Sequence, residues 1–357
     1  MAPPKIFVNP IFVNGGVVIL GAIIGSFLNC LIYRLPRSIS LIAPERSFCP
    51  ACKRMLPWQE NLPLLSWLFL QGRCSGCQAP ISFRYFLVEA ISAFLFWLCY
   101  VHVGFPLAIA GWVLISLLIV ATFIDLEHLM IPDVISLGGV ISGVAASFFF
   151  PSLMGTTSRS AALFFSLGSA TLGYVLLWGV LELGKMAFGR RKLRWSKASV
   201  FQLFKKEGAL FLQLQSGLDK EEILLQEVLL RPSDQITAKT LSLEIGNERF
   251  DTASFTISCR EISLPGRSWN LNEIFSMRAE IIELVLPREA MGFGDVKFLA
   301  CIGAFLGVKG MIFSLFAGSI IGAIIGSLIL LITRGRKGRC IPFGPYLALG
   351  TLLWFLG

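Results

Sequence analysis

Long apolar stretches alternate with polar segments along much of this 357-residue chain. A run of roughly 18 or more apolar residues is long enough to cross a bilayer as an α-helix. The pattern therefore predicts an all-α polytopic membrane protein with about eight transmembrane helices. Their expected ranges are 12–33, 86–103, 106–124, 133–150, 161–183, 295–308, 310–332 and 343–356.

A polar segment over 184–290 interrupts the apolar pattern and has mixed periodicity. It opens with the basic run Arg190–Arg194, and Glu221–Leu230 has helix-like spacing. Three later runs alternate apolar and polar residues as strands do, with turn residues between them. These runs are Thr240–Ile245, Ser254–Ile262 and Ile281–Leu286. We predict a small β-rich cytoplasmic insert with a structural or partner-binding role, because it contains no catalytic constellation.

The two interruptions divide the chain into five expected parts. The first helix, residues 1–33, is followed by a cytoplasmic cysteine-containing domain over 34–85. Residues 86–183 carry helices two to five, residues 184–290 form the insert, and residues 291–357 carry helices six to eight.

Composition supports the membrane assignment. The chain is 55% hydrophobic, with a mean hydropathy of +0.73, which is above the usual range of soluble domains. Five of its nine cysteines are scattered, so the pattern is not a disulfide framework and indicates a reducing compartment.

The net charge of +9 is best explained by the topology. If the N-terminus is outside, the cytoplasmic segments are 34–85, 125–132, 184–297 and 333–342. Only Lys5, Arg159 and Lys309 of the 31 basic residues then lie outside, as the positive-inside rule requires. No basic helix with interleaved aromatic residues is evident, so we expect no nucleic-acid partner.

Two CxxC pairs lie close together in the first polar segment. Cys49 and Cys52 form one pair, and Cys74 and Cys77 form the other. Four thiolates in one short loop are typical of a tetrahedral zinc site, which is structural because no position is left open for water. A redox role for one dithiol is the weaker alternative.

Few ionisable residues fall in or beside the predicted spans, where charge is costly and often functional. Asp125 ends the third span and Asp295 begins the sixth, so both are expected at the cytoplasmic edge. Two close carboxyl groups share a proton, which suits aspartic peptide hydrolysis. Gly292 and Gly294 leave room for a substrate backbone beside Asp295. The alternatives are an interfacial anchor for Asp125, and a helix cap or a Lys297 partner for Asp295.

Several motifs occur in a fixed order and together resemble the type IV prepilin peptidase family, a GxGD-type group of aspartic membrane proteases. Any one motif is weak evidence, but the set covers nearly the whole chain outside the insert. The motifs are Gly25–Asn29, Tyr33–Pro36, the paired CxxC loop, Ile81–Tyr85 leading to Glu89, Ile124–Asp133, Gly292–Lys297 and Pro342–Pro345.

The resemblance implies a bifunctional enzyme of the bacterial inner membrane that serves type IV pili or type II secretion. Such an enzyme cleaves prepilins or pseudopilins after the leader glycine, at the cytoplasmic face, and then N-methylates the new terminus with S-adenosylmethionine. Asp125 and Asp295 carry over as the catalytic pair, and the four CxxC cysteines as zinc ligands. No glycine-rich cofactor loop supports methyl transfer independently.

Three points stay open in the sequence. Glu89 is either an interfacial carboxylate or a contact to the basic leader. The general base of the aspartate pair is not identified. The rival functions are a presenilin-like protease that cuts inside a span, and a non-catalytic zinc-containing membrane scaffold of a pilus or secretion assembly.

Overall fold

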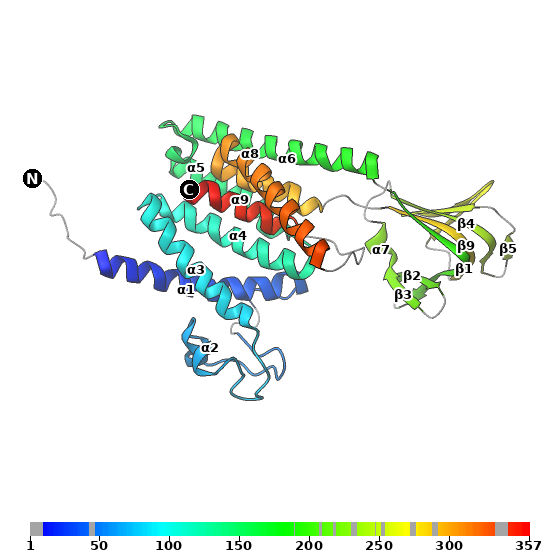
Figure 1. Ribbon diagram of the computed structural model, residues 1–357, viewed down its shortest axis with the longest axis horizontal. Coiled ribbons are helices and arrows are strands. Elements are labelled where there is room, and N and C mark those ends of the chain that lie inside the picture. Colours follow the sequence, from blue (N-terminus) through cyan, green and yellow to red (C-terminus); the bar gives the residue numbers. More distant parts are fainter. Residues whose placement is uncertain are drawn as a thin grey trace, which may run out of the picture. The chain divides into compact units, whose positions relative to one another are not determined.

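A computed structural model describes most of the chain, and its elements are drawn in Figure 1. It forms two compact units, Met1–Gly179 together with Met291–Gly357, and Val180–Ala290. The described residues are 10–42, 47–188, 190–206, 209–216, 219–229, 234–246, 248–250, 254–271, 276–287, 292–332 and 342–357.

The first unit is helical. Its apolar helices are α1 (Pro10–Arg34), α3 (Phe83–Val103), α4 (Ala108–His128), α5 (Asp133–Phe149), most of α6 (Arg159–Phe188), α8 (Phe293–Ile332) and α9 (Gly344–Leu356). Five of them are long and apolar enough to cross a membrane, whereas α5 and α9 are shorter. This confirms a mostly helical chain with several apolar helices.

The sixth and seventh predicted spans, 295–308 and 310–332, form one element, α8. This helix is broken at Gly307, whose φ of 67° and ψ of −174° are not helical. Glycine adopts a positive φ without the steric cost that a side chain adds. The break therefore lies at the end of the predicted range 295–308, two residues before the position where the sequence suggested a boundary.

Close backbone contact holds α1 against α3. A Cβ atom built at Gly21 would lie 2.7 Å from Ala93 Cα, and one at Gly25 would lie 2.8 Å from Glu89 Cα. Small residues permit such approach where apolar burial gives no drive for helices to associate. Gly21 and Gly25, four residues apart on α1, permit this packing, which fixes Glu89 of α3 beside α1.

A cysteine-containing loop joins α1 to α3. It holds the short helices η1 (Leu35–Arg37), η2 (Trp58–Asn61) and α2 (Leu65–Phe69). Another short helix, η3 (Pro151–Met154), follows α5.

The second unit carries an antiparallel nine-stranded sheet with the order β3-β2-β1-β9-β4-β6-β7-β8, and β5 pairs with β4. The strands are β1 (Arg190–Lys206), β2 (Ala209–Ser216), β3 (Asp219–Leu224), β4 (Gln235–Ile245), β5 (Glu248–Phe250), β6 (Ser254–Ser258), β7 (Glu261–Leu264), β8 (Arg267–Asn270) and β9 (Ser276–Pro287). A short helix, α7 (Leu225–Val228), follows β3.

Alternation along the strands builds an apolar core from residues such as Phe201, Ile236, Phe255 and Ile281. The β-rich character of the insert is confirmed. The helix expected over Glu221–Leu230 is mostly wrong, since β3 runs to Leu224 and, within the described residues, only one helical turn follows; Leu230 lies outside them. Pairing of β3 with β2 overrides the local helical spacing there.

Candidate active site and cysteine cluster

Asp125 lies in the last turns of α4, and its side chain is buried with 5% of the residue exposed. The backbone N–H of Gly344, at the start of α9, donates a hydrogen bond to its Oδ2 atom at 2.9 Å. The N-terminus of a helix offers free N–H groups and a partial positive charge. Helix α9 thus holds one oxygen of this carboxyl group from a segment more than two hundred residues away.

Asp295 lies in the first turn of α8 and is 7% exposed. Its Oδ1 atom is buried and has no hydrogen-bond partner within the described part of the chain. Ile131 packs against both Gly294, which precedes Asp295, and Gly344, whose N–H contacts Asp125. The two acids therefore lie near one another in the helical unit, and one oxygen is available to a further group.

Ile131 packs between the segments that carry the two acids. A Cβ atom at Gly344 would lie 3.0 Å from Ile131 Cδ1, and one at Gly294 would lie 3.1 Å from Ile131 Cβ. Both glycines thus let their backbones close onto this side chain. Ile131 occupies the space beside Gly294, and the approach of a substrate backbone to Asp295 stays a prediction.

Gly292 and Gly344 differ in how closely each backbone approaches a carboxyl oxygen of the acid pair. A Cβ at Gly292 would lie at an ordinary distance, 3.5 Å, from Asp295 Oδ2, whereas one at Gly344 would lie 2.8 Å from Asp125 Oδ2. Gly344 is the site residue that sequence reasoning missed. Its signal was the Pro342–Pro345 motif, which was noted without a role.

Lys297 lies two residues beyond Asp295 but pairs with a different acid. Its Nζ atom is 2.6 Å from Asp133 Oδ1 at the start of α5, and it lies 5.0 Å from the centre of the Phe293 ring. The structure therefore contradicts the alternative in which Lys297 pairs with Asp295. The ion pair instead joins α8 to α5.

The four CxxC cysteines form two equivalent turns. The Cys49 N–H donates to Arg54 O and the Lys53 N–H to Cys49 O, both at 2.9 Å. The second turn repeats these bonds, from Cys74 to Ala79 and from Gln78 to Cys74, at 3.0 and 2.9 Å. Lys53 and Gln78, each just after the second cysteine, have positive φ values of 61° and 58°.

The two turns bring the four sulfur atoms within 4.8 Å of one another. Cys49 and Cys74 are buried, whereas Cys52 and Cys77 are exposed. Backbone hydrogen bonds from Cys77 and Gly76 lower the pKa of Cys74 to about 6, whereas burial and the neighbouring cysteines raise that of Cys77 to about 11. A site with four thiol ligands and a depressed thiol pKa can bind a metal ion, and its chemistry fits tetrahedral zinc.

Charged side chains brace the two turns. Glu60 accepts hydrogen bonds from Arg54 of the first turn and, at 2.8 Å, from Ser75 of the second. These hydrogen bonds lower the pKa of Glu60, and the bond from Arg54 has the larger effect. The brace therefore keeps the cysteine turns together through an ionised carboxylate.

Glu89 attaches the cysteine loop to α3. Its side chain accepts a 2.7 Å hydrogen bond from the N–H of Leu64, and the residue is 8% exposed. Leu64 precedes α2 and has a φ of 63°, which is unusual for a residue with a side chain. Glu89 thus fixes a strained turn of the loop, while its contact to a leader peptide stays a prediction.

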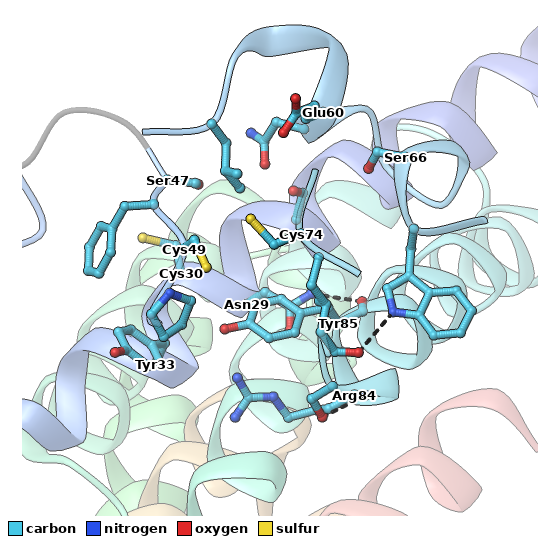
Figure 2. Close-up of a pocket in the computed structure, with 18 of the residues that line it drawn as sticks. Asn29, Cys30, Tyr33, Ser47, Cys49, Glu60, Ser66, Cys74, Arg84 and Tyr85 are labelled. Carbon is cyan, nitrogen blue, oxygen red and sulfur yellow. Dashed lines mark hydrogen bonds between the residues drawn. The ribbon is translucent and has the colours of Figure 1, made fainter. Parts of the chain in front are cut away.

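A cavity of about 390 Å³ lies between the cysteine loop and helices α1, α3 and α4 (Figure 2). Asn29, Tyr33, Cys49, Arg84 and Glu127 are among its lining residues. This volume falls within the range of roughly 300–1,000 Å³ for small-molecule pockets.

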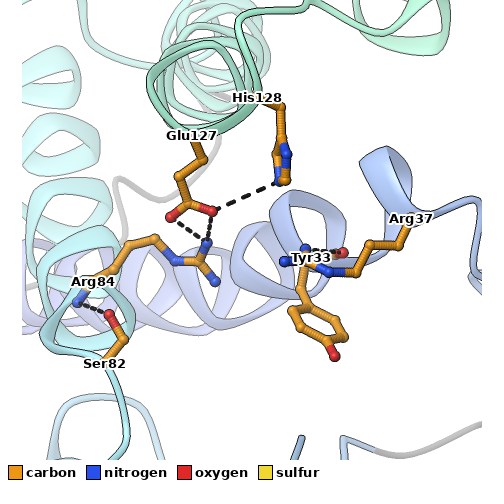
Figure 3. Close-up of polar contacts among 6 residues, drawn as sticks. All are labelled: Tyr33, Arg37, Ser82, Arg84, Glu127 and His128. Carbon is orange, nitrogen blue, oxygen red and sulfur yellow. Dashed lines mark hydrogen bonds and ion pairs between the residues drawn. The ribbon is translucent and has the colours of Figure 1, made fainter. Parts of the chain in front are cut away.

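One ion pair joins α3 to α4 at the cavity wall (Figure 3). Arg84 Nη1 donates to Glu127 Oε1 at 2.7 Å and to Oε2 at 2.6 Å. His128 Nε2 lies 4.0 Å from the same carboxylate. Asp125 and Glu127 both lie near the end of α4, but residues two apart point to nearly opposite sides of a helix, so the acid pair and the cavity lie on different sides of it.

Comparison with known proteins places the sequence among peptidases. Residues 19–103 match the model of the bacterial peptidase A24 N-terminal domain. Residues 112–211 and 271–327 match the model of the type IV leader peptidase family, and the break in this match falls inside the insert. The chain belongs to the type IV leader peptidase family.

Several curated relatives share the name prepilin leader peptidase/N-methyltransferase. The Aeromonas hydrophila protein is 28% identical over 95% of this chain and 89% of its own length. The Pseudomonas aeruginosa protein is 27% identical over 94% of this chain and 89% of its own length. A Myxococcus xanthus relative is 45% identical, but the match covers only 36% of this chain and 39% of that protein. No solved structure matches.

Proposed function

We propose that this protein is a membrane-embedded aspartic endopeptidase that removes the leader from prepilins or pseudopilins and then methylates the new N-terminus. Cleavage follows the leader glycine at the cytoplasmic face of the bacterial inner membrane, and the N-terminus of the enzyme is periplasmic. Support comes from the family, the apolar helices and, above all, the buried proximity of Asp125 and Asp295.

The proposed cleavage uses the two acids as one unit. One carboxylate takes a proton from water, whose oxygen attacks the scissile carbonyl carbon while the other carboxyl group protonates the carbonyl oxygen. The C–N bond then breaks and the departing amine takes a proton. The Gly344 N–H fixes one oxygen of Asp125, and such preorganisation lowers the barrier because no reorientation is needed during reaction.

The cysteine cluster is proposed to hold structural zinc. Cys49, Cys52, Cys74 and Cys77 would supply all four ligands, so the ion stabilises the loop and leaves no position for water. The loop, tied to α3 through Glu89, then shapes the face that meets the leader.

Methyl transfer is proposed from the name shared by the relatives. When bound, S-adenosylmethionine supplies a methyl group to the amine that cleavage exposes, which loses a proton as the C–S electron pair stays on sulfur. The chain would have to hold this cosubstrate within reach of the new amine and provide an acceptor for the proton that the amine loses.

Mass spectrometry of a prepilin co-expressed with this protein tests the proposal. We expect loss of the leader at its glycine and one added methyl on the new N-terminus. Co-expression with Asp295→Asn should leave the precursor intact, whereas Asp234→Asn in the insert should process it normally.

The same spectra separate the rival functions. A cut inside the apolar segment of the prepilin would indicate a presenilin-like protease instead. If the prepilin is fully processed in cells that carry either Asp125→Asn or Asp295→Asn, these acids do not cut it, which a non-catalytic scaffold predicts and which overturns the proposal.

A further inference from the structure

The short helix α2 of the cysteine loop exposes an apolar side. Leu65, Leu68 and Phe69 lie at helical spacing, so their side chains share one side of the helix. They are 50%, 53% and 80% exposed, and Leu62, just before the helix, is 39% exposed. Clusters of large exposed apolar side chains mark sites that contact another protein or a membrane. We call these four residues the α2 face.

The opposite side of α2 is held against α3. The centre of the Trp67 ring lies 5.5 Å from that of the Phe83 ring and 5.4 Å from that of the Phe86 ring. The Leu64 N–H, just before α2, donates to Glu89 one turn further along α3. Helix α2 therefore lies beside the first two turns of α3, and the α2 face points away from that helix.

These contacts place α2 alongside the apolar helices rather than beyond their ends. A Cβ atom at Gly25 of α1 would lie 2.8 Å from Glu89 Cα, so Glu89 and its partner Leu64 are level with Gly25. The distance along α1 from Gly25 to the last residue, Arg34, is about 13 Å at the rise of an α-helix. Figure 1 likewise draws α2 level with the middle of α1 and not beyond its C-terminal end. Both α1 and α3 are long and apolar enough to cross a membrane, so α2 lies at the depth of these spans.

The chemistry of this segment suits an apolar medium. Residues 61–72 contain no charged side chain. Within hydrocarbon, backbone polar groups must find their partners inside the protein. The Leu64 N–H meets this requirement through Glu89 at 2.7 Å. The Ser66 N–H does so through Leu62 O at 3.0 Å, and the Leu68 N–H through Leu64 O at 3.3 Å. These N–H groups need no water, so the start of α2 can lie in lipid.

The charge of the cysteine loop favours a lipid surface over other occupants. Residues 34–85 contain seven basic and two acidic residues. Anionic lipid headgroups attract a segment of this charge. A second copy of the same loop, or a basic leader peptide, would meet like charge, which opposes association.

We propose that the α2 face inserts among the acyl chains of the bilayer and anchors the cysteine loop to the membrane. Headgroup phosphates then meet the basic residues that flank this face, such as the exposed Arg73. The loop is a membrane-bound platform rather than a domain free in the cytosol. The choice of the cytoplasmic leaflet follows the proposed topology, whereas the anchor itself does not depend on prepilin cleavage.

Photolabelling of the wild-type full chain tests the anchor without a substitution. Single copies are placed in nanodiscs of phosphatidylcholine and phosphatidylglycerol and labelled with a lipid-soluble aryl diazirine, and tandem mass spectrometry locates the adducts. We expect adducts on Leu68 and Phe69 at a yield similar to that of Phe94, which is 56% exposed on α3. Leu241, 57% exposed in the polar insert, should carry none. Adducts on Phe94 with none on the α2 face would overturn the proposal.

A charge on the α2 face should lift it from the lipid. In Phe69→Asp, the yield of adducts on Leu65 and Leu68 should fall roughly tenfold, because a carboxylate is excluded from hydrocarbon. The matched control is Met55→Asp, which is 57% exposed in the same loop but lies outside the α2 face; it should leave these yields unchanged. Phe94 should keep its adducts in both variants, which shows that the helices remain inserted. Undiminished labelling of the α2 face in Phe69→Asp would contradict the anchor.

Two other outcomes would assign the α2 face to a protein instead. If the adducts disappear when each nanodisc holds two copies, the face is a surface for self-association. If an added prepilin removes them, the face receives the apolar segment of the substrate. Either result overturns the lipid anchor, whereas labelling that survives both additions supports it.

Discussion

The helical unit and the inserted sheet differ in what they bury. The helical unit buries charged side chains, Arg34, Glu89, Asp125 and Asp295. The described part of the sheet buries an apolar core, and its buried polar residues are the uncharged Ser199, Gln213 and Thr240. Burying charge costs stability and persists where it serves chemistry or positioning. The difference supports our proposal that the helical unit carries the activity, whereas the structural or partner-binding role of the sheet stays a prediction.

The largest expected effect is the loss of either acid. Asp125→Asn or Asp295→Asn keeps the shape but removes a proton acceptor, so prepilin cleavage should fall by roughly 10²–10⁴-fold. Single-turnover rates with purified protein measure this loss. Normal rates from both variants would mean that burial of these acids is structural.

A smaller effect should follow from moving one acid without removing it. A Cβ atom at Gly344 would lie 2.8 Å from Asp125 Oδ2, so Gly344→Ala must displace the carboxylate or α9. We expect cleavage to slow by about 10²-fold, the scale of a misplaced catalytic group. Gly138→Ala, where no atom lies within 4 Å of the added carbon, is the control. Equal rates for the two variants would show that the Gly344 contact does not position Asp125.

Substitution of a cysteine in the cluster should lower the metal content of the protein. Cys52→Ser or Cys77→Ser removes one of four ligands, and bound zinc should fall about tenfold or more from about one ion per chain. Elemental analysis of purified protein gives this number. Cys259→Ser, in the insert, should retain the metal. Undiminished zinc in the first two variants would place the ion elsewhere.

The smallest effect on cleavage should come from the sheet. Phe255 is 1% exposed in the apolar core, and Phe255→Ala should destabilise the insert by about 3–5 kcal/mol. Native-state proteolysis in urea measures this change, with the exposed Leu241→Ala as the control. Prepilin cleavage below the unfolding transition should stay near the wild-type rate. A rate loss as large as that of an acid variant would assign the sheet a direct role.

Much of the site can be predicted from the sequence because charge stands out in an apolar chain. Asp125 and Asp295 are conspicuous at the ends of apolar runs, and the two CxxC pairs are regular enough to indicate one cluster. The helices follow from apolar length in the same way. Their breaks follow less well, since the kink at Gly307 and the length of α8 depend on packing.

The interactions between distant segments were not predictable from local pattern. The Gly344 N–H donates to Asp125, which lies 219 positions earlier in the chain. The Leu64 N–H of the cysteine loop donates to Glu89 on α3. Backbone donors leave no mark in a sequence. Strand β1 was missed for a related reason, because its basic residues look like a cytoplasmic flank until β2 and β9 pair with it.

The central claim is that the two acids act as one unit, and a double variant tests it most directly. The single-turnover cleavage rate of Asp125→Asn/Asp295→Asn should equal that of the slower single variant, because residues that share one step are strongly non-additive. If the two losses instead multiply, or if the double variant cleaves normally, the acids are not a catalytic pair.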